Sequence, residues 1–327
     1  MKNKKIIIAG GTGFIGSEMI KHFGVSNEVI VFTRGINNVK TNSFKTGVAL
    51  PHSHDNIKYI IWDAEHLGDW VHALENADLV INLSGKTVNC RYNEKNKAEI
   101  MNSRINATKI LGEAIQKSIH PPKLWINASS ATIYRHATDR PQDEFTGDIK
   151  DDFSVQVCKQ WEKTFFEHRT AFTRKVALRM AITIGSGGIM TPYFNLIKFG
   201  LGGKQGTGKQ MYSWIHIEDT IRMIEWIYDH PEIEGFYNCC SPNPVTNNKF
   251  MSTLRKETGY KFGFPAFKWM LSIGAKLIGT ETELILKSRW VVPTKILQSG
   301  FVFKYALLED AFADIINKTP RNKYHLF

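Results

Sequence analysis

The sequence predicts an α/β protein in which a Rossmann-type, doubly wound parallel sheet is followed by a smaller, mainly helical C-terminal substrate domain. Short β-branched runs alternate with helical patterns up to about residue 180, which is typical of βαβ units and a parallel sheet. A Gly-rich turn follows the first of these runs and opens the first helical pattern. Beyond residue 185 the alternation stops, and glycine-rich loops give way to helical patterns.

Six near-continuous apolar runs mark the expected strands, and their lack of alternation indicates a sheet that is covered on both faces. The predicted strands are 5–9, 28–33, 57–61, 78–83, 123–128 and 175–182. The predicted helices between them lie near 14–23, 67–76, 94–117 and 152–168. The segment 35–56 carries Gly, Asn, Pro and His without periodicity, so we expect an exposed excursion there.

The second half of the chain has a different pattern of glycines and apolar residues. The glycines of 185–188 and 200–208 predict long loops. After them we expect a helix over 218–229 and a short late strand over 235–238. The remainder, 245–327, is predicted to be mainly helical.

Two domains are expected for a chain of 327 residues. The first comprises 1–183 together with about 211–240, and it holds the sheet and the Gly-rich turn. The second, a substrate domain, comprises about 184–210 and 241–327.

The charge of the chain bears on its partners. Lys and Arg total 42 against 31 Asp and Glu, and the resulting net charge of +11 suits a nucleic-acid-binding protein. The positive residues are scattered, however, and no run of five like charges and no basic stripe interleaved with aromatic residues occurs. We therefore expect no nucleic-acid partner. A basic protein that attracts an anionic cofactor and a small-molecule substrate fits the charge better.

The cysteines and the hydropathy indicate a cytoplasmic protein. None of the four cysteines forms a C-x-x-C pair, so we expect reduced thiols. No stretch of eighteen apolar residues occurs, so we expect no membrane partner. The histidines show no metal-ligand spacing near a cysteine, so we expect no metal site. Nothing in the sequence indicates an oligomeric state.

Three glycines spaced three apart, Gly10, Gly13 and Gly16, give the strongest functional signal. The first permits a tight turn, the second lets the backbone approach a pyrophosphate, and the third lets the helix pack closely on the strand. Unpaired N–H groups and the helix dipole favour phosphates at such a helix N-terminus. The turn therefore predicts dinucleotide binding. Its predicted contacts are Gly10, Thr12, Gly13, Phe14, Ile15 and Gly16.

The end of the second predicted strand bears on the choice between NAD and NADP(H). An NAD site places Asp or Glu there for the ribose 2′-hydroxyl, but this chain has Thr33-Arg34 and no carboxylate. A guanidinium suits a 2′-phosphate, so NADP(H) is the predicted cofactor. The alternative is that Arg34 is an ordinary exposed loop cation. Further cofactor contacts are predicted after the third and fourth strands, at Asp63, Leu83, Ser84 and Gly85.

Motifs spread over nearly the whole chain resemble the extended, or atypical, short-chain dehydrogenase/reductases. The chain is most similar to their epimerase-family branch, which is nucleoside-diphosphate-sugar epimerase-like and includes bacterial members labelled cell-division inhibitors. The tail from Val292-Pro293 through Ser299–Phe303 looks like the small C-terminal domain peculiar to this branch. The other motifs that carry the resemblance are Gly10 to Gly16, Trp62-Asp63, Asn82 to Gly85, Ser103-Arg104, Ser130-Ala131-Thr132 with Tyr134, Cys158 with Trp161-Glu162, Arg179, Gly200 to Gly203 and Trp214 to Ile217.

The resemblance implies a site for NADP(H), to which Arg104 contributes, and hydride transfer at a sugar or ketone carbon. In such families a Tyr gives or takes the hydroxyl proton, and a Lys four residues later lowers the pKa of that Tyr. A Ser or Thr orients the reacting oxygen. Ser130 stands where this Ser is expected, at the end of the fifth strand. The alternative for Ser130 is a hydroxyl that caps a loop.

The Tyr-x-x-x-Lys pair itself is missing, because none of the ten tyrosines has Lys four residues on. Counted back from Glu162, the usual Tyr and Lys places hold Ser154 and Cys158. We interpret Cys158 as a packed thiol rather than a nucleophile. Tyr134 is the best remaining proton donor. The alternative for Tyr134 is an aromatic ring packed over the nicotinamide.

Two further residues have structural interpretations. Arg179 lies in a predicted buried strand, where a guanidinium must be paired, and we expect it to tie the two domains together rather than to touch substrate. His216, beside Glu218 and Asp219 at a predicted helix start, is expected to belong to a structural network rather than to act as a base.

Two functions remain for the chain. The first is an NADP(H)-dependent oxidoreductase or epimerase-like enzyme that acts on a small carbonyl or sugar-type substrate, with Ser130, Tyr134 and the loop 200–210 lining its pocket. The second is a catalytically weak NADP(H)-binding regulatory protein, since the Tyr-x-x-x-Lys pair is absent. The sequence favours the enzyme.

Overall fold

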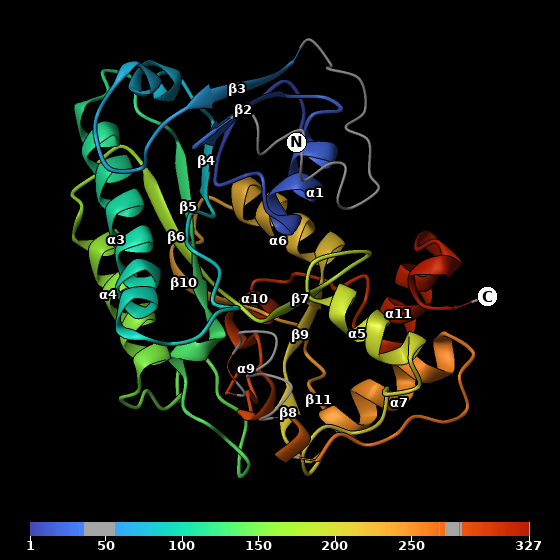
Figure 1. Cartoon of the computed structure of the whole chain (residues 1–327). Coiled ribbons are helices and arrows are strands. Elements are labelled where there is room, and N and C mark those ends of the chain that lie inside the picture. The colour runs from blue at the N-terminus through green and yellow to red at the C-terminus, as the bar shows by residue number, and fades with distance from the viewer. Residues whose placement is uncertain (36–55, 268, 272–280, 282, 327) are drawn as a thin grey trace.

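The computed structural model describes residues 1–35, 56–267, 269–271, 281 and 283–326. Its centre is a seven-stranded parallel sheet with the order β10-β6-β5-β4-β1-β2-β3 (Figure 1). The strands are β1 (Lys5–Ala9), β2 (Glu28–Thr33), β3 (Ile57–Ile61), β4 (Leu79–Asn82), β5 (Leu124–Ser130), β6 (Arg174–Met180) and β10 (Gly235–Cys239). The predicted α/β fold with a doubly wound sheet is confirmed. Of the excursion predicted over 35–56, residues 36–55 lie outside the described part of the chain.

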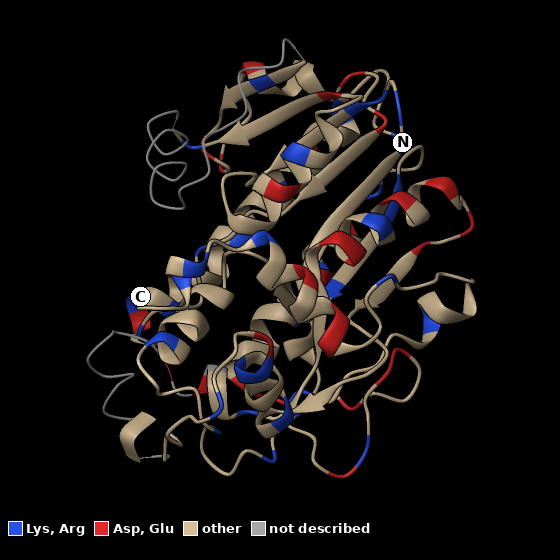
Figure 2. Cartoon of the chain, turned by 90° about the vertical axis from the view of Figure 1, so that its right-hand side faces the viewer, with Lys and Arg blue, Asp and Glu red and all other residues tan. Residues whose placement is uncertain are grey.

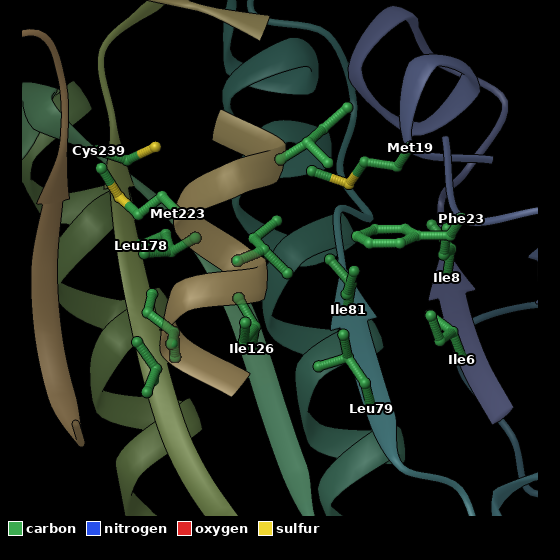
Figure 3. Close-up of a cluster of buried hydrophobic side chains, with 14 of the residues drawn as sticks. Ile6, Ile8, Met19, Phe23, Leu79, Ile81, Ile126, Leu178, Met223 and Cys239 are labelled. Carbon is green, nitrogen blue, oxygen red and sulfur yellow. The ribbon is translucent and has the colours of Figure 1, made fainter. Parts of the chain in front are cut away.

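Helices cover both faces of the sheet, as the continuous apolar runs predict (Figure 1). One face carries α1 (Phe14–Phe23) and α6 (Ile217–Asp229), and the other carries η1 (Asp69–Leu74), α3 (Glu94–Lys117) and α4 (Phe153–Glu167). Alternate residues of a strand point to opposite faces, so Ile6 and Ile8 pack under α1 and α6 while Ile7 packs on the α3 side (Figure 3). Each fully buried Ile stabilises the fold by roughly 1.5–3 kcal/mol relative to an exposed one.

Two elements differ from the expectation. β3 lies at the edge of the described sheet, where it pairs with β2, and its residues are half-buried or exposed instead of being covered on both faces. The helix predicted over 67–76 is a six-residue 3-10 helix, η1, that has no side-chain cap at Gly68. Asn76, at φ 57°, adopts the left-handed conformation just after it and prevents a longer helix.

The strand predicted over 175–182 is divided between two sheets. β6 ends at Met180, and the chain continues as β7 (Ile182–Ile184), which pairs in parallel with β9 (Trp214–His216). The backbone changes partner within two residues, because the Ala181 N–H donates to Cys239 O at 3.0 Å and the Ile182 N–H to Ser213 O at 3.2 Å. This division leads the chain from the large sheet into the C-terminal half.

The loop predicted after residue 185 contains a helix, α5 (Met190–Lys198), that the flanking glycines hid. Its buried residues have the helical spacing of an amphipathic face: Met190, Tyr193, Phe194 and Ile197. Together with α7 (Asn247–Glu257) and α11 (Leu308–Lys318) it forms a third apolar cluster around Phe250 and Phe312. The helical C-terminal region is thus confirmed, whereas the domain boundaries stay a prediction.

The remaining elements of the C-terminal half are short. They are β8 (Met211–Tyr212), β11 (Val245–Thr246), α9 (Glu283–Leu286), α10 (Thr294–Gln298) and η3 (Arg321–Lys323). Lys and Arg are interspersed with Asp and Glu over the ribbon, without a stripe of one sign (Figure 2). In the part of the chain that the structure describes, no helix combines the length and the apolar character needed to cross a membrane.

Candidate functional site

A cavity of about 310 Å³ lies where β1, β2, β3 and β4 end. The strand order reverses between β1 and β4, and ligands of such open sheets bind at the carboxyl ends of the strands beside this switch point. The cavity is lined by Gly10, Thr12, Gly13, Phe32, Thr33, Arg34, Trp62, Asp63, Ala64, Glu65, Leu83, Ser84, Gly85, Ser103 and Asn106. Gly10, Thr12 and Gly13 of the Gly-rich turn therefore meet the predicted contacts from the ends of three other strands in one place.

The three glycines of the turn have three different surroundings. Gly10, at φ 77°, is left-handed, and a Cβ there would lie 2.9 Å from the backbone of Leu83 and Ser84. A Cβ at Gly16 would lie 2.5 Å from Gly11, so the helix approaches the turn more closely than any other residue allows. A Cβ at Gly13 would meet nothing within 4 Å. Gly10 and Gly16 thus shape the turn, and Gly13 borders open space inside the cavity.

The first turn of α1 points its free N–H groups toward this cavity end of the sheet. Gly13 is the N-cap residue, and it provides no side-chain cap. The first turn carries no acidic side chain, so the helix dipole stays available to an anion. Three of the predicted contacts from the turn, Phe14, Ile15 and Gly16, do not line the cavity, and Phe14 and Ile15 instead pack beside the large core. The Phe14 ring lies against the glycines of 185–188.

Ser84, which follows β4, has a buried hydroxyl without a partner among the described residues. Its backbone N–H donates to Asn82 Oδ1 at 3.0 Å, which fixes the loop while the hydroxyl lines the cavity. A buried hydroxyl of this kind needs an acceptor or donor from outside the chain. Ser84 and the open space at Gly13 therefore fit the phosphates or ribose of a dinucleotide.

Arg104 lies behind the same loop and does not line the cavity. Its Nη1 donates to Lys86 O at 3.0 Å and to Ile100 O at 2.9 Å, and its guanidinium lies over the Trp161 ring. A Cβ at Gly85 would lie 3.0 Å from the guanidinium carbon, so Arg104 fills the space beneath Gly85. The structure therefore places Arg104 as a support of the cofactor loop, and direct contact with a cofactor stays a prediction.

The far end of the cavity is polar and has mixed charge. Arg34 is exposed there, directly after β2. Asp63 accepts from the N–H groups of His66 and Glu65, at 2.9 Å each, and these hydrogen bonds lower the pKa of Asp63 to about 2. Asn106 of α3 donates to Glu65 Oε1 at 3.3 Å. Asp63 thus lines the cavity as predicted, with its carboxylate already holding the turn that follows β3.

Several cavity residues were not predicted as cofactor contacts, among them Trp62, Glu65, Ser103 and Asn106, although Trp62 and Ser103 belong to motifs that carry the family resemblance. Trp62 and Glu65 are close to the predicted Asp63 in sequence. Because the ends of parallel strands line the cavity, the end of the third strand could have predicted both residues. Ser103 and Asn106 lie on one face of α3, and only the packing of that helix beside β4 brings them to the cavity.

Ser130 and Tyr134 do not line this cavity. Ser130 ends β5 and caps the short helix η2 (Ala131–Ile133), because its Oγ accepts from the Thr132 N–H at 3.2 Å. The same Oγ lies 2.5 Å from Thr132 Oγ1. The capping alternative for Ser130 is what the structure shows, and its orienting role in catalysis stays a prediction.

Tyr134 lies in a buried polar network. Its hydroxyl donates to Asn238 Oδ1 at 3.1 Å and accepts from Arg179 Nη1 at 2.8 Å. Arg179 also binds Glu162 through two hydrogen bonds of 2.8 Å, and Glu162 accepts from Ser129 Oγ at 2.6 Å. Burial raises the pKa of Tyr134 to about 12. A hydroxyl with both kinds of partner inside the protein is poorly placed to give its proton to a substrate.

The expectation for Arg179 is confirmed in one respect and wrong in another. The guanidinium is buried and paired, as predicted. Burial by itself lowers the pKa of Arg179, but the hydrogen bonds and charge of Glu162 outweigh burial and raise it. The partners of Arg179 are Glu162 of α4 and Tyr134, both within 1–183, so Arg179 ties a helix to the sheet and not one domain to another.

His216 and Cys158 behave as expected. His216 is the N-cap of α6, where its Nδ1 accepts from the Glu218 N–H at 3.2 Å, and its ring lies against Tyr305 at 4.1 Å between centroids. Burial lowers the pKa of His216, which suits a neutral structural ring. Cys158 is buried with its Sγ 3.5 Å from Thr132 Oγ1, and burial raises the pKa of its thiol to about 11. A thiol of such high pKa is a poor nucleophile.

Comparison with known proteins agrees with this geometry. The model of the NAD dependent epimerase/dehydratase family matches residues 6–240. The chain belongs to this family. A second model, a domain of unknown function called DUF1731, matches residues 266–315. Both matches confirm the resemblance drawn from the sequence, and the family makes a pyridine dinucleotide the expected ligand of the cavity.

Relatives span the whole chain. An epimerase family protein of Staphylococcus saprophyticus is 31% identical over 317 residues, which cover 96% of this chain and all of that protein. The epimerase family protein YfhF of Bacillus subtilis is 32% identical, with 95% and 97% covered. Among solved structures, the human epimerase family protein SDR39U1 (isoform 2) with NADPH has a TM-score of 0.80 at 25% identity and covers 95% of this chain and 99% of its own. A UDP-N-acetylglucosamine 4-epimerase of Methanobrevibacter ruminantium shares the fold, with a TM-score of 0.76 at 18% identity and 97% and 98% covered.

Proposed function

We propose that this family member is an NADP(H)-dependent oxidoreductase or epimerase-like enzyme that acts on a small carbonyl or sugar-type substrate. The observation that carries the cofactor choice is the end of β2, where Thr33 and Arg34 line the cavity and no carboxylate follows. A carboxylate at this place repels a 2′-phosphate, and a guanidinium attracts it. The human relative of similar fold, which has NADPH bound, supports the same choice.

The residues of the chain divide the binding of NADP(H) among them. Gly13 and the first turn of α1 would hold the pyrophosphate, and Ser84 would give its free hydroxyl to the cofactor's middle. Arg34 would bind the 2′-phosphate at the far end. When bound, the cofactor supplies a hydride donor or acceptor to the site. These residues orient it, while the covered sheet beneath excludes water.

A second candidate is a catalytically weak NADP(H)-binding regulatory protein. The buried network of Tyr134 favours it, because that network removes the best proton donor found in the sequence. In this case the chain binds the dinucleotide tightly but does not turn it over. The two candidates differ in turnover and agree on cofactor binding.

Titration of the purified protein with NADPH and NADH tests the cofactor choice. We expect Arg34→Ala to weaken NADPH by about 10-fold to 100-fold and NADH by less than about 2-fold, because a charge-assisted hydrogen bond contributes about 1.5–3 kcal/mol. Arg321→Ala, which removes an exposed arginine of η3, is the matched control and should change neither affinity. An equal loss for both dinucleotides in Arg34→Ala contradicts the assignment.

Turnover separates the enzyme from the regulatory protein. A panel of ketones, oxo acids and nucleotide sugars is added to the NADPH-bound protein, and the absorbance of the reduced nicotinamide is followed. Loss of this absorbance with one class of compound supports an oxidoreductase. An epimerase returns the hydride to its substrate and leaves the absorbance unchanged, so formation of a sugar epimer by the NADP⁺-bound protein, detected by NMR, equally supports the enzyme. Tight NADPH binding without turnover of any of them supports the regulatory protein.

A further inference from the structure

Arg289 lies in the segment between α9 and α10, and its backbone is fixed on both sides. Its N–H donates to Met211 O at 2.8 Å, and its carbonyl accepts from the Ser213 N–H at 3.0 Å. Beside it, Ser288 donates its N–H to His136 Nδ1 at 2.9 Å and its hydroxyl to Ala137 O at 2.6 Å. The C-terminal segment is therefore attached both to β8 and to the loop after Tyr134, and the root of the Arg289 side chain is held in place.

The guanidinium of Arg289 is buried and largely without partners. The side chain is 12% exposed, and among the described residues neither Nε nor Nη1 has a hydrogen-bond partner. Nη2 lies 3.8 Å from Glu283 Oε1, which is too long for a hydrogen bond. Arg179 shows the contrast, since its Nε, Nη1 and Nη2 all have partners within 2.8 Å. A buried guanidinium with unsatisfied N–H groups is costly unless an acceptor from outside the chain completes it.

The neighbours of Arg289 place it beside the expected reaction centre. Glu283, the carboxylate nearest its guanidinium, also accepts from Ser154 Oγ at 3.3 Å, and Ser154 occupies the usual Tyr place of this kind of enzyme. Cys158, one helical turn further along α4, occupies the usual Lys place. The Cys158 Sγ lies 3.5 Å from Thr132 Oγ1, which in turn lies 2.5 Å from Ser130 Oγ. Through Glu283, Arg289 is thus connected to the start of α4, whose Cys158 leads on to the end of β5.

The other charges around Arg289 are already in use. Lys287 binds Asp152 and lies 2.9 Å from Glu283 Oε1. Ser154, at the usual Tyr place, donates to the same Glu283 oxygen at 3.3 Å. Burial lowers the pKa of Arg289, while the carboxylates of Glu283 and Asp152 act in the opposite direction, so the guanidinium stays charged. Of the two cations on this segment, Lys287 is paired and Arg289 is open to a ligand.

We propose that Arg289 binds a carboxylate of the substrate immediately beside the reacting carbonyl, so that the substrate class is a small oxo- or hydroxycarboxylate. This inference rests on the proposed function and names the substrate class of that site. In a nucleotide sugar the phosphates are separated from most of the reacting carbons by part of the sugar ring. An anion bound by Arg289 would lie beside Glu283 and Ser154, at the usual Tyr place and so at the expected reaction centre.

Calorimetric titration of the full chain saturated with NADP⁺ tests the proposal without requiring turnover. The probes are oxamate, inorganic phosphate and UDP. We expect wild-type protein to bind oxamate in a saturable way, and Arg289→Met to weaken this binding by about 10-fold to 100-fold. Arg289→Lys keeps the charge but loses the planar fork, and an intermediate loss is expected. Arg321→Met, which replaces an exposed arginine of η3, is the matched control and should bind oxamate within about 3-fold of wild type.

Thermal unfolding of the same variants shows whether Arg289 is structural. Because its N–H groups have no acceptors in the described chain, we expect Arg289→Met to leave the melting temperature unchanged or to raise it. A melting temperature lowered by more than about 5 °C, or failure of both Arg289 variants to fold, overturns the proposal.

The other results of the calorimetric titration also support or overturn the proposal. If wild-type protein binds UDP or phosphate more tightly than oxamate, and Arg289→Met loses that binding, the carboxylate assignment is overturned in favour of a phosphorylated substrate. No binding of oxamate to a wild-type protein that holds NADP⁺ overturns the proposal and leaves the proposed cofactor intact. A wild-type protein that fails to bind NADP(H) contradicts the proposed function itself, so the two failures are distinguishable.

Discussion

The dinucleotide end and the Arg289 end of this molecule show two ways of building a site at one edge of a sheet. The dinucleotide cavity is built from the ends of four successive strands, and all of its lining residues lie between Gly10 and Asn106. The Arg289 end combines residues from three distant parts of the chain, which are represented by Ser154, Met211 and Arg289. The residues of the first site come from consecutive βα turns and are close in sequence. The residues of the second site come together only after the C-terminal half has packed onto the sheet.

The two regions also differ in whether their polar groups have hydrogen-bond partners within the chain. At the cavity, Ser84 Oγ and the first turn of α1 are left open. A short distance along the same edge, Tyr134, Arg179 and Glu162 satisfy one another inside the protein. Arg289 resembles Ser84 in this respect, because its Nε and Nη1 also lack a hydrogen-bond partner in the described chain.

The largest expected effect tests whether the closed network is structural. Glu162→Ala leaves Arg179 buried without its carboxylate, so we expect the free energy of unfolding to fall by about 3–5 kcal/mol. Glu167→Ala on the same helix is the control, because the Glu167–Lys163 pair is exposed and should contribute less than about 1 kcal/mol. Denaturant unfolding measures both. If the free energy of unfolding falls by an equal, small amount in both variants, the network of Tyr134, Arg179 and Glu162 does not stabilise the fold as proposed.

A smaller effect is expected for Tyr134→Phe. This change removes one acceptor of Arg179 and one donor to Asn238, and we expect it to destabilise the fold by about 1–3 kcal/mol. NADPH affinity should stay within about 2-fold of wild type, and so should turnover of any substrate found. If turnover instead falls more than about 100-fold in a folded variant, Tyr134 is the proton donor after all.

The smallest effect is expected at the open end. Ser84→Ala removes a hydroxyl that has no partner in the described chain, so we expect no measurable change in unfolding. NADPH should bind about 2-fold to 10-fold more weakly, which corresponds to about 0.5–1.5 kcal/mol for one hydrogen bond. Ser252→Ala on α7 is the control, since its hydroxyl donates to Lys249 O far from the cavity. If the NADPH affinity of Ser84→Ala is unchanged, the Ser84 hydroxyl does not contact the phosphates or ribose of the cofactor.

The sheet and the Gly-rich turn could be predicted from the sequence because their signals are local. A run such as Ile6-Ile7-Ile8-Ala9 must be buried on both faces, and Gly10 to Gly16 follow it without interruption. The helices α1 and α3 begin and end at the residues expected from their patterns. Boundaries were less secure where the backbone changes partner, as at Ala181 between β6 and β7.

What escaped prediction depends on tertiary contacts. The helix α5 was hidden because the glycines around it outweigh a single amphipathic turn pattern. The pairing of Tyr134 with Arg179 and Asn238 spans up to 104 residues, and no local pattern marks it. Arg289 has an ordinary sequence context, and its distinguishing property is a buried charge without an acceptor, which only packing reveals.

The strand order has a consequence for the chain while it is being synthesised. β1 to β6 are complete at Met180, but α6 ends only at Asp229 and β10 at Cys239. Until then one face of the sheet, around Ile81 and Ile126, lacks the helix that covers it in the finished protein (Figure 3). Because synthesis proceeds from the N-terminus and exposed apolar faces aggregate, the nascent chain passes through a vulnerable interval. The apolar face of the sheet is therefore most prone to aggregate between these two points of elongation.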